Sequence, residues 1–331
     1  MFRSTTRWLN DEMSNDESYV IDDGFARWVA ELRRVDDQPC RDVGAQRLRE
    51  AGRARAASRP RGPDLPIVRD LRTDSGLCLR LYCPTREPRP ATLYLHGGGF
   101  VMGDLDSHDS TCRRLAQIAE VTVLAVDYRL APEYPGTAAV DDAVDAFGWA
   151  CQHLSEIGGD PSAGLAVAGD SSGGALALLT AVRLHASGMT PSALFLAYPN
   201  ADMTLSQPSV EQEGHGWGLD ADDLRWFVEQ WLPDHALRPN PQVSPLHADL
   251  AGLPPTILAT AEHDPLRDEG ILLAQQMGSV GVDVRHVSHP GLVHGFLGLG
   301  RVSTGADQAD HEMFEQFGCI VHRRDATESS H

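Results

Sequence analysis

Short apolar runs alternate with longer stretches whose apolar positions recur at the helical period over most of the chain. The runs of strand length are Ala91 to Leu95, Val121 to Val126, Leu165 to Ala168, Ala193 to Ala197, Thr256 to Ala261 and Val282 to Val287. The stretches of helical period are Asp109 to Ala119, Ala138 to Leu154, Ala175 to Ala186, Glu269 to Gly278 and Ala306 to Ile320. This alternation predicts parallel strands with helices on both faces of the sheet.

Two earlier runs, Ile67 to Thr73 and Leu77 to Tyr82, alternate apolar and polar positions and are joined by Asp74-Ser75-Gly76. A short connection that contains glycine predicts a β-hairpin, and an antiparallel hairpin suits the edge of a sheet. The sequence therefore predicts an α/β fold built on an eight-stranded, mostly parallel sheet.

Two segments fall outside this alternation, and we expect them to form a helical cap. One helix begins at Asp22 or Asp23, and its apolar stripe consists of Phe25, Trp28, Val29 and Leu32. A second helix follows Asp220, and its stripe consists of Leu224, Phe227, Val228, Trp231 and Leu232. We divide the chain into N-terminal leader and cap helices (1–60), a first part of the core (61–199), a cap insertion (200–245) and a second part of the core (246–331).

The composition argues against several classes of partner. The formal net charge of −19 would repel nucleic acid and anionic membranes, and the arginine-rich stretch between residues 41 and 61 has no interleaved aromatic residues. The six cysteines include no C-x-x-C pair, which fits a reducing compartment. No run approaches the roughly 18 apolar residues of a membrane span, and residues 1–18 lack the apolar segment of a signal peptide. We expect a cytoplasmic protein.

The stretch Gly169-Asp170-Ser171-Ser172-Gly173-Gly174 lies between a predicted strand and a predicted helix. A serine at the tip of such a strand–turn–helix element is held above the sheet, with glycines two residues before and two after it. Ser171 meets this spacing and is the candidate nucleophile. Ser172 does not, because Asp170 lies two residues before it.

A second glycine-rich turn, His96-Gly97-Gly98-Gly99, follows the strand that ends at Leu95. Its spacing fits neither a dinucleotide-binding fingerprint nor a phosphate-binding loop. Backbone N–H groups in such a turn can stabilise the oxyanion that forms during ester hydrolysis. We expect Gly98 and Gly99 to supply two of these donors and the N–H of Ser172 to supply a third.

A serine nucleophile needs an imidazole as its base and a carboxylate to orient that imidazole. Asp264 follows the next-to-last predicted strand and is the candidate acid. Asp268 and Glu269 look like charges at the N-terminus of the next helix, and Glu262 or Asp268 would be next in line as the acid. His294, in a glycine-flanked loop after the last strand, is the candidate base, whereas His289 lies nearer the end of that strand.

Five ordered motifs of the chain resemble those of a known family. The motifs HGGGF, DYRLAPE, GDSSGG, DPLRDEG and HGF occur in that order and look like the hormone-sensitive-lipase-like branch of α/β-hydrolases, most of all bacterial acetyl esterases. The resemblance implies a triad of Ser171, Asp264 and His294, oxyanion donors at Gly98, Gly99 and Ser172, and a lid over them. The chain departs from the family where Ser172 replaces the usual alanine, and where Tyr134-Pro135-Gly136 replaces His-Pro-Phe-Pro.

Together these features predict a serine carboxylesterase that acts on small-molecule esters through an acyl-enzyme and requires neither a metal nor an organic cofactor. An amidase or lactonase could use the same triad, and a non-catalytic receptor on this fold is a further alternative. Because bulky rings in the cap crowd the space above Ser171, we expect acyl chains of about two to six carbons to be preferred. Trp217 is the ring that we place nearest the acyl group. The physiological ester and the oligomeric state stay open.

Overall fold

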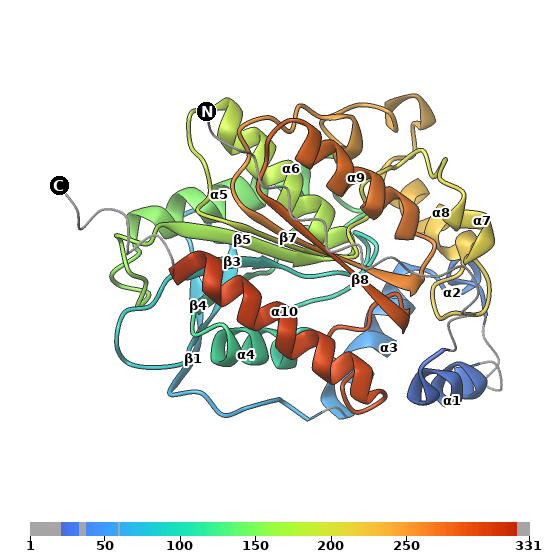
Figure 1. The fold of residues 1–331 in the computed structure, drawn as a ribbon, viewed down its shortest axis with the longest axis horizontal. Helices are drawn as coiled ribbons and strands as arrows, with labels where there is room; N and C mark the ends of the chain where they lie inside the picture. The colour runs from blue at the N-terminus through green and yellow to red at the C-terminus, as the bar shows by residue number, and fades with distance from the viewer. Residues whose placement is uncertain (1–20, 33–37, 59, 323–331) are drawn as a thin grey trace, which may run out of the picture.

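The computed structural model describes residues 21–32, 38–58 and 60–322 of the 331-residue chain. Its centre is one eight-stranded sheet in the order β1-β2-β4-β3-β5-β6-β7-β8 (Figure 1). The strands are β1 (Ile67–Arg72), β2 (Cys78–Cys83), β3 (Ala91–Leu95), β4 (Thr122–Val126), β5 (Leu165–Asp170), β6 (Leu194–Ala197), β7 (Thr256–His263) and β8 (Val284–Val293).

The pairing within this sheet confirms the predicted architecture. The first hairpin, β1 with β2, is antiparallel, with Arg72 opposite Cys78 on either side of the turn. Strands β2 and β4 are also antiparallel, and every later neighbour in the sheet is parallel. The hairpin therefore forms one edge of a mostly parallel sheet, as the alternation of the sequence indicates.

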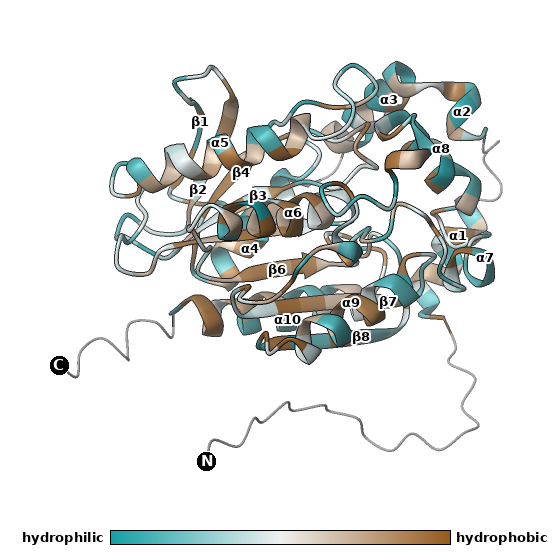
Figure 2. Cartoon of the chain, turned by 90° about the horizontal axis from the view of Figure 1, so that it is seen from above, coloured by the Kyte–Doolittle hydropathy of each residue, from teal (hydrophilic) through white to brown (hydrophobic). Residues whose placement is uncertain are grey.

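Helices cover both faces of the sheet (Figure 1). One face carries α5 (Ala138–Gln152), α6 (Ser172–Ala186) and α9 (Arg267–Ser279). The other face carries α4 (Asp109–Ile118) and α10 (Thr304–His322). Parallel strands buried on both faces are apolar along their whole length, and Figure 2 shows this for β6.

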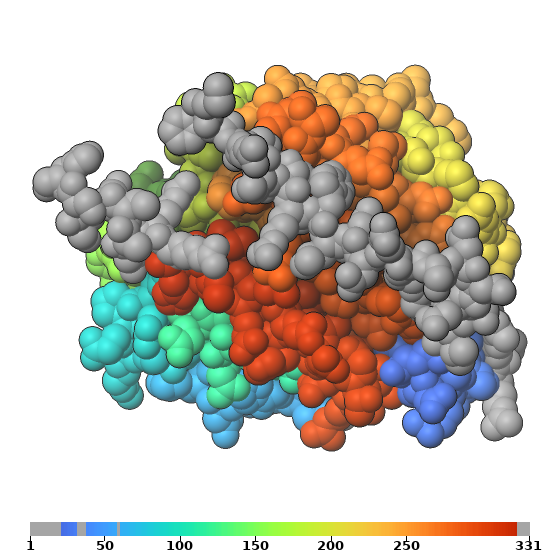
Figure 3. All heavy atoms as spheres, in the orientation of Figure 1, coloured from blue at the N-terminus to red at the C-terminus, as the bar shows by residue number. Residues whose placement is uncertain are grey.

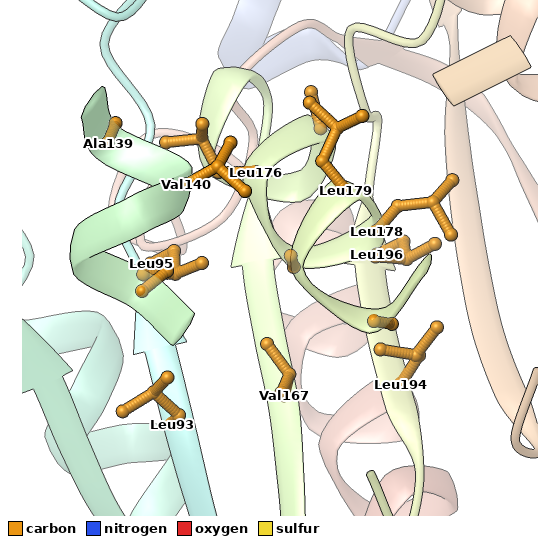
Figure 4. Close-up of a cluster of buried hydrophobic side chains, with 14 of the residues drawn as sticks. Leu93, Leu95, Ala139, Val140, Val167, Leu176, Leu178, Leu179, Leu194 and Leu196 are labelled. Carbon is orange, nitrogen blue, oxygen red and sulfur yellow. The ribbon is translucent and has the colours of Figure 1, made fainter. Parts of the chain in front are cut away.

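The core is divided by the sheet into two clusters. Between the sheet and α5 and α6, leucine and valine side chains from β3, β5 and β6 interdigitate with those of the two helices (Figure 4). On the opposite face, aromatic rings pack among small alanine side chains, and the ring centroid of Phe195 of β6 lies 5.6 Å from those of both Phe314 and Phe317 of α10. Burial of these side chains on both sides holds the sheet rigid beneath its carboxyl edge.

The remaining helices gather near the ends of the parallel strands (Figure 1). They are α1 (Asp23–Leu32), α2 (Cys40–Val43), α3 (Ala45–Ser58), α7 (Ser209–Gln212) and α8 (Ala221–Trp231), with the 3-10 turns η1 (His235–Leu237) and η2 (Pro245–His247) after them. Asp22 caps α1, because its Oδ1 accepts from the N–H groups of Gly24 and Phe25. Helix α1 packs beside the segment that precedes α10 (Figure 3).

Arginines of the basic stretch tie α3 to the body of the protein. Arg49 donates to the backbone carbonyls of Val101 and Ala131, each at 2.7 Å, and forms an ion pair with Glu133. Arg53 forms an ion pair with Asp104. This stretch therefore balances acidic groups of the DYRLAPE segment and of the turn after the glycine loop. None of the helices described here has the length and apolar content to cross a membrane.

Strand β8 differs from its predicted bounds. The apolar pattern predicts a strand from Val282 to Val287, but β8 runs on to Val293. It lies at the edge of the sheet, where Pro290 need not donate to a neighbouring strand, and the N–H of Gly291 is satisfied by the Glu262 carboxylate at 2.7 Å. The pair His263 and Val293 closes the β7–β8 ladder, so the residues that follow both strands emerge side by side.

Buried histidines predict that acid weakens the fold. Burial lowers the pKa of His96, His286 and His289 to about 4, from 6.5. The unfolded chain therefore binds more protons between these values, and the free energy of unfolding should fall as the pH drops from about 6.5 towards 4. We expect His289→Leu to remove up to about 2 kcal/mol of the pH dependence of the free energy of unfolding between about pH 7 and about pH 5, measured by urea unfolding at both values.

The exposed His311, which pairs with Glu315 on the surface of α10, provides the matched control. His311→Leu should leave the pH dependence close to that of the wild type, because an exposed pair contributes little. Equal slopes in all three proteins would contradict the assignment to His289.

Candidate active site

Ser171 occupies a strained turn between β5 and α6. Its φ of 53° and ψ of −124° lie outside the regions that a residue with a side chain normally adopts. The neighbouring loop holds it there, since the Ser171 N–H donates to the carbonyl of Ala197 at 2.8 Å and the Asn200 N–H donates to the carbonyl of Ser171 at 3.2 Å. The hydroxyl is thereby presented at the carboxyl edge of the sheet, as the sequence predicts.

The turn closes only because glycine stands at position 173. A β-carbon there would lie 2.1 Å from the carbonyl oxygen of Leu95 and 2.5 Å from that of His96. The start of α6 therefore packs directly on the end of β3. Leu95 also pairs with Gly169 across the sheet, so the nucleophile turn and the glycine-rich turn are built against each other.

The structure brings the three candidate triad residues together. Ser171 Oγ lies 2.9 Å from Nε2 of His294, and Nδ1 of His294 lies 2.8 Å from Oδ2 of Asp264. Asp264 is fully buried, and its other oxygen accepts from the N–H of Leu266 at 2.7 Å. The ring of Tyr198 meets the imidazole edge-on at 4.9 Å. This arrangement can take a proton from the Ser171 hydroxyl and hold the resulting imidazolium beside a carboxylate.

The alternative acids and base have other partners. Glu262 accepts from the N–H of Gly291, and Asp268 accepts from the N–H of Ser209 at 2.9 Å while pairing with Arg267. His289 lies within β8, buried against Phe296, with ring centroids 5.1 Å apart. These three side chains therefore support the loops around the site and do not contact Ser171, His294 or Asp264 through the bonds described.

Glu269 lies in the first turn of α9, as the sequence predicts, but its contacts are with the loop after β6. Its side chain is fully buried, and Oε1 accepts from the side-chain amide of Asn200 at 3.1 Å and from the N–H of Asp202 at 3.2 Å. Burial raises the pKa of this carboxyl well above its usual value. Glu269 therefore braces the loop after β6, whose residue Asn200 in turn binds the backbone of Ser171.

The glycine-rich turn borders the same cavity as Ser171 and His294. Gly98 and Gly99 both have positive φ, of 133° and 62°, which orients their peptide groups differently from those of a strand. The carbonyl of Gly98 accepts from the N–H of Met102 at 2.9 Å. Ser172 is the first residue of α6, where backbone N–H groups lack partners within the helix. All three candidate oxyanion donors thus belong to residues that line the same cavity as Ser171.

The cavity above Ser171 has a volume of about 1960 Å³ and is lined by both the core and the cap helices. Phe227 of α8 lies directly over the glycine turn, because a β-carbon on Gly99 would be 2.4 Å from its ring. Behind it, Trp231 stacks on Phe100 at a centroid distance of 3.8 Å. The sequence pattern identifies Phe227 only as part of an apolar stripe; its position over Gly99 depends on how α8 docks.

Trp217 does not border this cavity, which contradicts its predicted place beside the acyl group. Its neighbours Gly216 and Gly218 are among the lining residues, but the ring itself is turned away and stacks on His263 at 4.1 Å. His263 is also 3.3 Å from Glu213, which binds Arg267. Trp217 therefore packs the cap insertion onto the end of β7.

Within the described ranges, no cluster of three or more histidine, cysteine, aspartate or glutamate side chains is arranged to hold a metal ion.

Comparison with known proteins agrees with this geometry. Residues 92–298 match the family model described as alpha/beta hydrolase fold. The chain is 39% identical over 273 residues to the ethyl acetate hydrolase of Pseudomonas putida, which covers 80% of this chain and 86% of that protein. It is 39% identical over 239 residues to the carboxylesterase NlhH of Mycobacterium tuberculosis, which covers 70% and 74%.

A solved structure agrees over almost the whole chain. The hyperthermophilic esterase from the archaeon Pyrobaculum calidifontis has a TM-score of 0.83 and 32% sequence identity, and the match covers 92% of this chain and 99% of that one. These matches confirm the resemblance that the ordered motifs predict.

Substitution of the glycine at the turn tests how the site is built. Gly173→Ala should lower the free energy of unfolding by more than about 3 kcal/mol, because the new methyl group must displace backbone atoms of β3. Urea unfolding measures this loss.

The matched control is Gly148→Ala, in the interior of α5, where a β-carbon would meet nothing within 4 Å. This change should raise the stability by about 0.5–1 kcal/mol, as alanine does for glycine in a helix. Similar changes in the free energy of unfolding at both positions would show that the turn can accommodate a β-carbon at position 173, which would contradict the short distances to Leu95 and His96.

Proposed function

The chain belongs to the α/β-hydrolase fold family and is a carboxylic ester hydrolase, and on that premise we propose that it works through the triad Ser171, His294 and Asp264. The observation that carries the proposal is the continuous chain of contacts from Ser171 Oγ to the His294 imidazole, at 2.9 Å, and from there to the Asp264 carboxylate, at 2.8 Å. We infer that the acyl group passes through a covalent intermediate on Ser171.

In the first half of the reaction, Ser171 Oγ attacks the ester carbonyl carbon while Nε2 of His294 takes the hydroxyl proton. The carbonyl oxygen becomes an oxyanion. The tetrahedral intermediate then collapses, the bond to the alkoxy oxygen breaks, and His294 returns the proton to the departing alcohol. Asp264 accepts from Nδ1–H throughout and stabilises the imidazolium.

In the second half, a water molecule takes the place of the alcohol. His294 removes one of its protons as the oxygen attacks the acyl carbon, and the proton then passes to Ser171 Oγ as the acid is released. The N–H groups of Gly98, Gly99 and Ser172 stabilise the oxyanion in both halves. Each such donor is typically worth about 3–4 kcal/mol of the barrier. Their common position on the cavity beside Ser171 supports this role.

The named relatives favour esters over the amide and lactone alternatives. Both act, by name, on carboxylic esters, and one is named for ethyl acetate. That name supports a preference for short acyl chains in this chain as well. The structure supplies a physical reason in Phe227, whose ring over Gly99 would block an acyl chain that extended past the oxyanion turn on this side. The helices above the cavity act as the cap.

Other features remain predictions from sequence. They are the boundaries at residues 60, 199 and 245, the cytoplasmic location and the absence of a nucleic-acid partner.

Ser171→Ala should reduce kcat for p-nitrophenyl acetate by at least about 10⁴-fold, because the nucleophile is lost, while the urea unfolding curve stays close to that of the wild type. A fluorophosphonate probe should label the wild type at Ser171 and leave the variant unlabelled. Ser172→Ala is the control and should retain most activity, since its proposed donor is a backbone N–H. If Ser172→Ala lost its activity and Ser171→Ala kept it, the assignment of the nucleophile to Ser171 would be wrong.

The ester series from acetate to palmitate tests the role of Phe227. The wild type should show its highest kcat/KM at about two to six carbons, followed by a steep fall. Phe227→Ala should move the optimum to longer chains, because each additional methylene that finds an apolar site can contribute about 0.8 kcal/mol. Trp217→Ala is the control, and its optimum should not move. A wild-type optimum at about ten carbons or more would refute the short-chain proposal, and an unmoved optimum in Phe227→Ala would refute the part given to that ring.

A further inference from the structure

Asp170 joins the nucleophile turn to the glycine-rich turn. It directly precedes Ser171, and only 7% of its surface is exposed. Its Oδ1 accepts from the Tyr94 hydroxyl at 2.7 Å and from the N–H of Gly97 at 3.0 Å. One carboxylate therefore connects the end of β5 to the turn that follows β3.

The fit between this carboxylate and Gly97 is close. A β-carbon on Gly97 would lie 2.4 Å from Oδ2 of Asp170, so the carboxylate packs against the bare backbone of the turn. Gly97 is followed at once by Gly98 and Gly99, the proposed oxyanion donors. Oxyanion stabilisation depends on donors that are held in place before the reaction. Any shift of this carboxylate would therefore displace the N–H groups of Gly98 and Gly99.

His108 faces the second oxygen of the same carboxylate. Its Nε2 lies 3.5 Å from Oδ2 of Asp170, and its Nδ1 lies 2.9 Å from the hydroxyl oxygen of Ser107. His108 also borders the cavity above Ser171, although the triad does not use it. It stands immediately before α4, at the end of the turn that begins at Asp104.

Ser107 fixes the orientation of the His108 ring. The hydroxyl of Ser107 lies 2.8 Å from the carbonyl oxygen of Asp104 and accepts from the Asp104 N–H at 2.9 Å, so the turn holds it in place. Its contact with Nδ1 leaves Nε2 of the ring directed at the Asp170 carboxylate. A protonated Nε2 can donate to that carboxylate.

The surrounding groups agree with an ionised Asp170 carboxylate. Burial alone would raise the pKa of Asp170, but the charge and hydrogen bond of His108, followed by the hydrogen bond of Tyr94, outweigh it and lower that pKa. The neighbouring His96, 5.3 Å from His108 between ring centroids, has its pKa lowered to about 4 by burial and then by the His108 charge. His96 is therefore neutral near pH 7 and does not neutralise Asp170.

We propose that His108 is a positioning residue for ester hydrolysis. From Nε2 it holds the Asp170 carboxylate against Gly97, and thereby keeps the N–H groups of Gly98 and Gly99 directed at the oxyanion. Without this partner, one oxygen of a buried carboxylate beside the nucleophile would be left unsatisfied, and the carboxylate would draw in water or shift. This inference rests on the proposed function, because it assigns His108 to the stabilisation of the intermediate formed at Ser171.

The first test compares His108→Gln with the wild type on p-nitrophenyl acetate. We expect kcat to fall about tenfold, less than for the loss of an oxyanion donor itself, with KM changed by less than about twofold. The control is His153→Gln, at the end of α5, where the ring packs on Trp149 and lies outside the cavity lining. The control should keep wild-type kcat. Unchanged kcat in His108→Gln, or equal changes in kcat and KM, would overturn the proposal.

The second test asks whether His108 acts through Asp170. In an Asp170→Asn background there is no carboxylate for His108 to hold, so adding His108→Gln should change kcat by less than about twofold. A further tenfold loss in that background would show that His108 acts by another route and would overturn the proposal. If Asp170→Asn does not unfold cooperatively with urea, the first test is used alone: a fall in kcat with little change in KM in His108→Gln supports the proposal, and any other result overturns it.

Labelling separates failure of this inference from failure of the proposed function. A fluorophosphonate must react at Ser171 of the wild type for the proposed function to hold, whatever His108 does. Reaction at Ser171 with the same rate constant in wild type and His108→Gln would leave the triad intact and overturn only the role of His108. A rate constant about tenfold lower in His108→Gln, with His153→Gln unaffected, supports it.

Discussion

The strained backbone of Ser171 is the constraint on which the site depends. A serine with a φ of 53° persists only where its surroundings leave it no other position. Here β5, the bare backbone of Gly173 and the loop after β6 enclose the turn, and the rigid sheet between two packed helical layers holds all of them. Relaxing the turn would require β3 and β6 to move as well, so packing energy from the whole core maintains the exposed hydroxyl.

Buried carboxylates extend this constraint to the other reacting groups. Asp170 holds the turn with the proposed oxyanion donors, and Glu269 holds the loop after β6. Asp310 of α10 accepts from the N–H of Gly298, in the segment after His294, at 3.0 Å. Burial raises the pKa of Asp310 to about 7. Acceptors on rigid elements thus organise loops that have no regular hydrogen bonding of their own, which is a common way to fix a catalytic geometry on a stable scaffold.

The sequence predicts those parts of the molecule that follow from local periodicity. The alternation of strands and helices, the first hairpin and the glycine spacing around Ser171 are all local, and the structure agrees with them. The length of β8 and the burial of Glu269 are not local, because they depend on an edge position and on a loop far away in sequence. The meeting of Asp264 and His294 could be anticipated because parallel neighbouring strands end at one edge of the sheet.

The cap shows why specificity is harder to predict than chemistry. Trp217 lies in a glycine-flanked run with no helical period, so the sequence does not predict the direction of its ring. In the structure that direction is set by stacking on His263. Phe227 belongs to a clear helical stripe, but the stripe is wide enough to pack on the core and border the cavity at once. The reacting groups are each fixed by the end of a strand, whereas the cap reaches the site through side-chain packing between helices. Substitutions in the cap can therefore reshape the cavity while the strand ends beneath it keep their geometry.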